Sequence, residues 1–108
     1  MKTIWLVVPC YNEEEVLPET SKQLKNVMSS MIENGKISPE SKIAFVNDGS
    51  KDNTWNIIST LCTGDGIFAG INLSRNKGHQ NALLAGLMTA KKYADAVISL
   101  DADLQDDV

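Results

Sequence analysis

The sequence predicts an α/β protein with a Rossmann-like parallel sheet and alternating helices. Four short apolar stretches, rich in Val, Ile, Leu or Phe and with little polar alternation, have the composition of strands buried on both faces. Three stretches with helical apolar spacing separate them. Since strand and helix alternate, the strands are expected to be parallel with right-handed crossovers. The predicted strands cover residues 3–8, 42–47, 67–73 and 96–100.

The first predicted helix covers residues 13–33. Pro18 lies near its start, where proline is tolerated, and Asn34 with Gly35 forms a stop signal at its end. Apolar residues recur at helical spacing in one stripe, which is expected to face the sheet. The stripe consists of Leu17, Leu24, Val27, Met28, Met31 and Ile32.

The second predicted helix covers residues 53–62 and the third covers residues 79–93. Ser50 or Asp52 is placed to cap the second helix. Gly86 lowers the helix propensity of the third, which indicates close packing on the sheet at that position. The predicted inward faces are Trp55, Ile58, Leu61 and Cys62 on the second helix, and Ala82, Leu83, Leu87 and Met88 on the third.

With 108 residues, 43% hydrophobic and 22% charged, the chain has the size and balance of one small globular domain. Its longest apolar run, residues 4–8, is far shorter than the roughly 20 residues that a membrane-spanning helix needs. The formal net charge of −4 argues against nucleic acid as a partner, but not against a small phosphorylated ligand. Cys10 and Cys62 lack metal-binding spacing and are expected to be buried, reduced thiols of a cytoplasmic protein.

A polar cluster follows each predicted strand. The clusters lie at residues 9–13, 47–52, 74–80 and 101–103, and the connections at the opposite edge hold nothing comparable. Because the carboxyl ends of parallel strands share one edge of the sheet, these clusters are expected to form one polar rim. Ligands of open α/β sheets bind at that edge.

The sharpest chemistry lies in the acidic run after the fourth predicted strand. Asp101 and Asp103 are two residues apart, so both carboxylates are expected on the same side of the chain, with Gln105 next in the series. Such hard oxygen ligands suit Mg²⁺ or Mn²⁺. The same acids also fit a solvated loop, but their position on the polar rim favours a metal site. An EF-hand is excluded because Asp106 stands where that loop needs glycine.

Asp48 stands in an Asn-Asp-Gly-Ser turn at the end of the second predicted strand. Its carboxylate is placed to accept a hydrogen bond from a nucleotide base, and an ordinary role in the turn is an equally good interpretation. Ser50 and Asp52 are assigned to the turn and to the helix cap.

Arg75, Lys77 and His79 supply local positive charge at the start of the third predicted helix. Backbone N–H groups and the helix dipole favour an anion such as a diphosphate there, and a solvated basic turn is the alternative. His79 is the only histidine, so any Ser-His-Asp triad would have to include it. Neither a Walker loop nor a G-x-G-x-x-G motif is present, which argues against a dinucleotide site.

Taken together, the four polar motifs resemble the family 2 glycosyltransferases, most closely the polyprenyl-phosphate (dolichol-phosphate-type) hexosyltransferase branch. The resemblance covers essentially the whole chain and implies that residues 1–108 are the N-terminal, nucleotide-sugar-binding part of a GT-A fold. The motifs are Pro-Cys-Tyr-Asn-Glu at residues 9–13, Asn-Asp-Gly-Ser at 47–50, Ser-Arg-Asn-x-Gly at 74–78 and Asp-Ala-Asp-Leu-Gln-Asp at 101–106.

The resemblance implies a nucleotide site on the first three motifs. The loop with Pro9, Tyr11 and Glu13 would frame the nucleoside. Asp48 would bind the base, and Arg75 would lie near the base or the diphosphate. The expected donor is a UDP- or GDP-sugar.

For the fourth motif the resemblance implies binding of metal and diphosphate. Asp101 and Asp103 would hold Mg²⁺ or Mn²⁺ against the donor diphosphate, with Gln105 assisting. The implied reaction transfers a hexose, with inversion, to a polyprenyl phosphate or a glycan. A divalent ion suits this chemistry because the leaving nucleoside diphosphate accumulates negative charge.

Two features depart from the family pattern. Asp107 follows Asp106 where the branch usually has proline, and the chain ends at Val108. The family places the acceptor site, any general base and, in this branch, membrane helices downstream of that point. We therefore expect a truncated donor-binding part that binds donor weakly and does not turn over alone. Membrane contact is expected only through such further segments, at the cytoplasmic face.

Two other classes of protein remain as alternatives. A sugar-nucleotide pyrophosphorylase shares a similar sheet but would have a Gly-rich, Arg- or Lys-containing loop after its first strand, unlike residues 9–13. A non-catalytic α/β interaction domain of the receiver type would carry acids after strand one and strands two to three, with a later lysine. Here the acids follow the second and fourth predicted strands.

Overall fold

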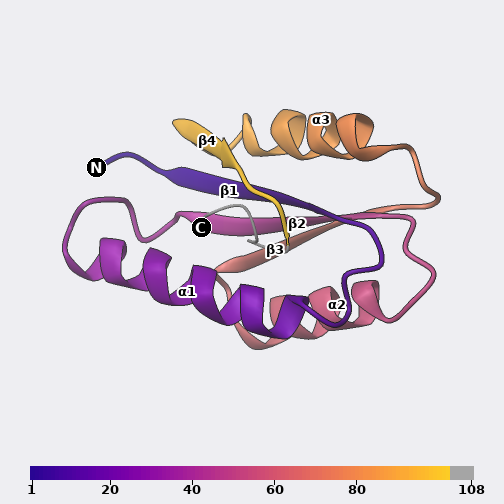
Figure 1. The fold of residues 1–108 in the computed structure, drawn as a ribbon. Coiled ribbons are helices and arrows are strands. Elements are labelled where there is room, and N and C mark those ends of the chain that lie inside the picture. The colour runs from indigo at the N-terminus through magenta and orange to yellow at the C-terminus, as the bar shows by residue number, and fades with distance from the viewer. Residues whose placement is uncertain (103–108) are drawn as a thin grey trace.

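The computed structural model describes residues 1–102 and shows the predicted alternation of strands and helices (Figure 1). Neighbouring strands pair in parallel, in the sheet order β3-β2-β1-β4. The predicted α/β class with a parallel sheet is therefore confirmed. The elements are β1 (Ile4–Cys10), α1 (Leu17–Glu33), β2 (Lys42–Asp48), α2 (Thr54–Gly64), β3 (Phe68–Leu73), α3 (His79–Ala90) and β4 (Ala96–Ser99).

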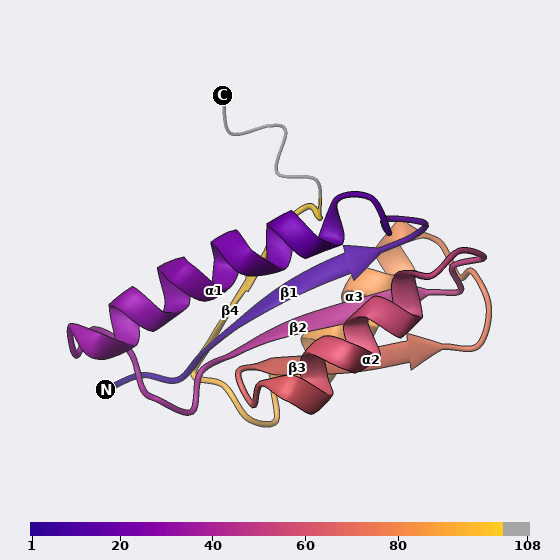
Figure 2. The same ribbon diagram turned by 90° about the horizontal axis from the view of Figure 1, so that it is seen from below.

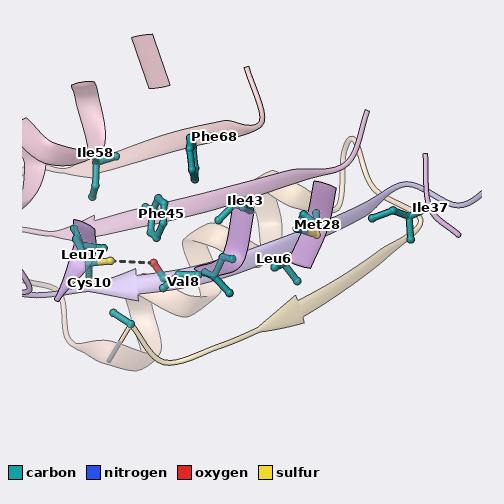
Figure 3. Packing of buried hydrophobic residues seen from close by; sticks show 12 residues of the cluster. Leu6, Val8, Cys10, Leu17, Met28, Ile37, Ile43, Phe45, Ile58 and Phe68 are labelled. Atoms are coloured by element: carbon teal, nitrogen blue, oxygen red, sulfur yellow. Dashed lines mark hydrogen bonds between the residues drawn. The ribbon is translucent and has the colours of Figure 1, made fainter. Parts of the chain in front are cut away.

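The helices cover both faces of the sheet. α1 and α2 lie on one face and α3 lies on the other (Figures 1 and 2). Side chains of β1 alternate between the two: Leu6 and Val8 join the core beside α1 and α2, whereas Trp5 and Val7 join the core beside α3. Figure 3 shows the first of these cores. β1 is thus apolar on both faces, which explains its uninterrupted apolar sequence.

Gly86 brings α3 close to the sheet, as the sequence predicts. A Cβ atom at this position would lie 2.4 Å from Val7 Cγ1 and 2.9 Å from Val46 Cγ2. A larger side chain would therefore push the helix away from the centre of the sheet. Because His79 begins the same helix, this contact also helps to set where the start of α3 lies relative to the sheet edge.

Two predictions about how strands and helices are buried are wrong. β3 and β4 are edge strands of the described sheet, so they are not buried on both faces: exposed and partly buried residues alternate in β3 after Phe68, and Ile98 of β4 is 48% exposed. Val27 of α1 and Met88 of α3, both predicted to face the sheet, are exposed. Val27 lies at the margin of the buried stripe of α1. Met88 lies on the face of α3 opposite its buried residues Ala82, Gly86 and Ala90.

The helix boundaries differ from the predicted ones where turns flank the helices. α1 begins at Leu17 rather than at residue 13. The residues before Leu17 form a turn, in which the Glu13 carbonyl accepts hydrogen bonds from the Val16 and Leu17 N–H groups. α3 ends at Ala90 rather than at residue 93, because the Lys92 and Tyr93 N–H groups donate to carbonyls three residues back, as in a turn. Such turns have helix-like spacing in the sequence, which is why the pattern extends across them.

The cysteines are free thiols, with Cys10 buried and Cys62 only half-buried. The prediction of reduced thiols therefore holds, and the predicted burial is right for Cys10 and wrong for Cys62. Within residues 1–102, no helix has the length and apolar character needed to cross a membrane.

Candidate functional site

A cavity of about 280 Å³ lies where the predicted polar rim is expected. Its walls come from the carboxyl ends of β1, β2 and β4 and from the start of α3, segments that are far apart in the sequence. Of the predicted substrate-binding residues in residues 1–102, all but Arg75 line it. The lining residues are Pro9, Cys10, Tyr11, Glu13, Asp48, His79, Ala82, Asp101 and Ala102.

Pro9 opens the sheet at this point. The last hydrogen bond of the β1–β4 ladder joins the Leu100 N–H to the Val7 carbonyl, at 3.0 Å. Alternate residues of a strand direct their backbone groups to the same neighbour, so Pro9 is the next residue of β1 on the β4 side. Proline has no N–H to donate, and the ladder stops. Residues that follow the ends of β1 and β4, among them Tyr11 and Asp101, line the cavity.

The β1–α1 loop is attached to the β2–α2 loop by hydrogen bonds that we call the loop clasp. The Asn12 N–H donates to Ser50 Oγ at 3.0 Å, and the Lys51 N–H donates to Asn12 Oδ1 at 2.8 Å. Asn12 has a positive φ of 53°, a conformation that asparagine tolerates better than most residues. The two loops therefore hold each other in a defined conformation.

The loop clasp continues at Glu13, whose side chain lines the cavity. The Glu13 N–H donates to Thr54 Oγ1 at 2.8 Å, and the Glu14 N–H donates to Asp52 Oδ2 at 3.3 Å. Asp52 Oδ1 also accepts hydrogen bonds from the Thr54 hydroxyl and N–H, so Asp52 binds the first N–H of α2. The N-cap position itself is Asn53, not the predicted Asp52. Ser50, the other cap candidate, binds Asn12 instead. These contacts fix the backbone beside Tyr11 and Glu13.

The predicted turn at Asp48 holds the β3–α3 loop against the rim. Asp48 is 3% exposed, and its Oδ1 accepts a hydrogen bond from the Lys77 N–H at 2.6 Å. Gly49 has a φ of +65°, and a Cβ atom there would lie 2.2 Å from the Asn76 backbone N. One oxygen of Asp48 thus has a structural role, while the residue also lines the cavity, so both sequence interpretations of Asp48 keep support.

Of the basic groups of the rim, His79 lines the cavity and Arg75 does not. Arg75 is exposed and does not belong to the cavity lining; its backbone packs against Gly49. His79 does line the cavity, as the first residue of α3, after a Gly78 N-cap that makes no side-chain cap hydrogen bond. The feature of the sequence that points to His79 is its position at the start of a predicted helix, directly after a polar cluster of the rim.

Cys10 lines the cavity but has the properties of a structural thiol. Its Sγ donates to the Val8 carbonyl at 3.3 Å (Figure 3). Burial, and then the nearby Glu13 carboxylate, raises the pKa of this thiol far above its usual range. It therefore stays protonated at neutral pH, which argues against cysteine nucleophilic catalysis.

Of the predicted metal ligands, Asp101 is exposed at the cavity, while Asp103 and Gln105 lie outside the described residues. Within residues 1–102, no group of three or more His, Cys, Asp or Glu residues is placed to hold a metal ion. Asp101 therefore offers one carboxylate within the described residues. One carboxylate can be enough for Mg²⁺, which takes one or two carboxylates and completes its shell with phosphate oxygens and water. The donor set therefore suits a cation shared with a phosphorylated ligand.

Comparison with known proteins agrees with this geometry. Residues 5–108 match the family described as Glycosyl transferase family 2. The chain is 54% identical over 103 residues to YkoT, an uncharacterised glycosyltransferase of Bacillus subtilis, covering 95% of this chain and 31% of that protein. It is 42% identical over 106 residues to the bactoprenol glucosyl transferase of Shigella phage SfV, covering 97% and 32%. The chain thus spans about a third of the length of these relatives.

The solved structures show the same fold. The mannosyltransferase PcManGT of Pyrobaculum calidifontis, solved in complex with GDP-Man and Mn²⁺, superposes with a TM-score of 0.64 at 21% identity, covering 94% of this chain and 28% of that one. The architecture is therefore of the GT-A type. Because the family match covers nearly the whole chain, it also decides against the pyrophosphorylase and the interaction domain. A polar cavity at the carboxyl edge of a GT-A sheet and a match over residues 5–108 lead to one conclusion: the chain belongs to glycosyl transferase family 2.

Proposed function

We propose that this protein transfers a hexose from a nucleoside-diphosphate sugar to a polyprenyl phosphate, with inversion, and that residues 1–108 are its donor-binding part. The observation that carries the proposal is the shared cavity at the carboxyl edge of the sheet. It brings together Tyr11, Glu13, Asp48 and Asp101, which come from separate motifs of the sequence.

The proposed nucleoside site lies on the loop clasp side of the cavity. Pro9, Tyr11 and Glu13 frame the nucleoside there, and Asp48 binds the base. The support is that the backbone of this region is already held in place, so little ordering is required when the ligand binds. Arg75, exposed on the neighbouring loop, approaches the base or diphosphate from outside the cavity lining.

The proposed diphosphate site requires a cation. Glu13, Asp48 and Asp101 all line the cavity, and these carboxylates would repel a bare diphosphate. We therefore assign Mg²⁺ or Mn²⁺ to Asp101, with Asp103 and Gln105 as further ligands. A bound divalent ion offsets the charge that develops on the leaving diphosphate. His79 is the first residue of α3, where the N-cap Gly78 has no side chain to bind the free N–H groups, and we assign it to a phosphate oxygen.

The proposed acceptor follows from the relatives. One of them is a bactoprenol glucosyl transferase, and bactoprenol phosphate is a polyprenyl phosphate. A lipid-linked acceptor places the reaction at a membrane surface, which we take to be the cytoplasmic face, in cell-envelope glycan synthesis. The net charge of −4 fits a small phosphorylated ligand better than nucleic acid.

Titration calorimetry with UDP and with GDP, in Mn²⁺, in Mg²⁺ and in chelator, tests this proposal. We expect metal-dependent binding of one nucleotide, weakened about tenfold by Asp101→Asn, the size of a charged hydrogen bond or ligand. Glu40→Gln is the matched control because Glu40 is exposed at the opposite edge of the sheet. No binding of either nucleotide by the wild-type protein, or equal binding by Asp101→Asn, would overturn the proposal.

A further inference from the structure

The chain that leaves β4 is bound by α1 through a buried hydrogen bond. The Thr20 hydroxyl donates to the Ala102 carbonyl, with Oγ1 and O 2.6 Å apart. Thr20 is 3% exposed and Ala102 is 2% exposed, although 82 positions separate them in the sequence. Ala102 also packs in the apolar core that contains Leu17 and Leu24 of the same helix. The residue next to Asp101 is therefore fixed by both packing and a polar contact.

Thr20 behaves differently from the neighbouring hydroxyl on α1. Ser21 is equally buried, but its Oγ donates to the Pro18 carbonyl within its own helix. That is a common arrangement for a Ser or Thr in a helix. Thr20 directs its hydroxyl out of the helix to a different segment. The contact therefore links α1 to the acidic run, beyond the point where Pro9 ends the sheet ladder.

We propose that Thr20 is a positioning residue for the metal- and diphosphate-binding segment. It holds Ala102, and through it Asp101, at the cavity, so that the carboxylate is in place before cation and nucleotide bind. Without the hydroxyl, the buried Ala102 carbonyl loses its partner and the segment moves to regain one. This inference rests on the function proposed above and extends it to a residue that touches neither ligand.

The test measures the affinity of the full-length protein for the nucleotide that binds, in Mn²⁺ and in chelator. Thr20→Val keeps the shape of the side chain and removes the donor. We expect it to weaken Mn²⁺-dependent binding about fivefold, as for the loss of one hydrogen bond, and to leave binding in chelator unchanged. Thr20→Ser is expected to retain the wild-type ratio of the two affinities. Ser21→Ala, the matched control, is expected to leave the ratio unchanged.

The outcomes separate this inference from the proposed function. If wild-type protein shows no Mn²⁺-dependent nucleotide binding, the proposed function fails, and this inference with it. If wild-type protein shows it and folded Thr20→Val keeps the full ratio, only the positioning role is wrong. If Thr20→Val does not fold, Thr20→Cys, a weaker donor of similar size, replaces it. The quantity compared is the affinity in Mn²⁺ divided by the affinity in chelator. A smaller ratio for Thr20→Cys than for Thr20→Ser supports the positioning role of Thr20, and equal ratios overturn it.

Discussion

On one side of the cavity, the β1–α1 and β2–α2 loops are joined by the loop clasp. On the other side, the loop before α3 is bound to Asp48 and the chain after β4 is bound to Thr20. The first side carries the groups assigned to the nucleoside. The second carries His79 and Asp101, assigned to the diphosphate and the metal. We infer that the nucleoside side is preformed, while the charged side depends on a few contacts that can each be removed by one substitution.

The largest effect is expected at Gly49, where the two sides of the rim meet. Gly49→Ala places a Cβ atom 2.2 Å from the Asn76 backbone N, at a φ of +65°. We expect the free energy of unfolding to fall by about 3 kcal/mol, measured by urea unfolding. Gly35→Ala is the matched control, because Gly35 also has a positive φ, +71°, but no atom lies within 4 Å of its Cβ position. Its expected cost is about 1 kcal/mol. Equal costs at both sites would mean that the loop contact at Gly49 does not hold the rim.

A smaller effect is expected from breaking the loop clasp. Thr54 is fully buried at 0% exposure, accepts from the Glu13 N–H and donates to Asp52. Thr54→Val removes the buried hydroxyl that accepts from the Glu13 N–H and that donates to Asp52, and it should lower the free energy of unfolding by about 2 kcal/mol. Thr60→Val is the control, since the exposed Thr60 hydroxyl bonds only its own helix, to the Asn56 carbonyl, and its loss should cost less than about 0.5 kcal/mol. A similar loss in the two variants would contradict a rigid nucleoside side.

The smallest effect is expected in the pH dependence of stability. Desolvation acts to raise the pKa of Asp52, but hydrogen bonds from the Thr54 hydroxyl, the Thr54 N–H and the Glu14 N–H outweigh it and hold the pKa below its ordinary value of 3.8. Asp52 therefore stabilises the fold above the unfolded pKa, and this contribution disappears as the pH falls through the folded one. As the pH falls below about 4, the free energy of unfolding of Asp52→Asn should decrease less than that of the wild-type protein. Urea unfolding at a series of pH values measures this difference.

Asp65 offers a comparison for the same measurement. Its pKa is lowered first by the hydrogen-bonded ion pair with Lys25, and then by the Ile67 N–H. A surface ion pair is screened by salt. The stability that Asp65 contributes and that is lost in acid should therefore be smaller in high salt. The corresponding contribution of Asp52, whose hydrogen-bond partners are neutral, should be unchanged. If salt reduces both equally, the loop clasp does not act through neutral hydrogen bonds.

Much of the site could be predicted from the sequence because its chemistry follows strand ends. Tyr11, Glu13, Asp48 and Asp101 belong to motifs that each come after an apolar stretch, and parallel strands bring such positions to one edge. The sequence identifies His79 as a basic residue at a helix start, but nothing local shows which groups there face a cavity, so only the structure reveals that His79 lines it. The roles of Asp103 and Gln105, beyond the described residues, stay predictions.

The order of elements, the parallel sheet and the polar edge can be read from the sequence, since apolar periodicity and turn chemistry are local properties of the chain. Which strands lie at the edges, why Val27 and Met88 stay exposed, and which polar groups pair across the loops depend on how the elements pack in the folded molecule. The bond from Thr20 to Ala102 is of this second kind. It joins residues at opposite ends of the chain, and its existence depends on how α1 packs beside the end of β4, which no local pattern encodes.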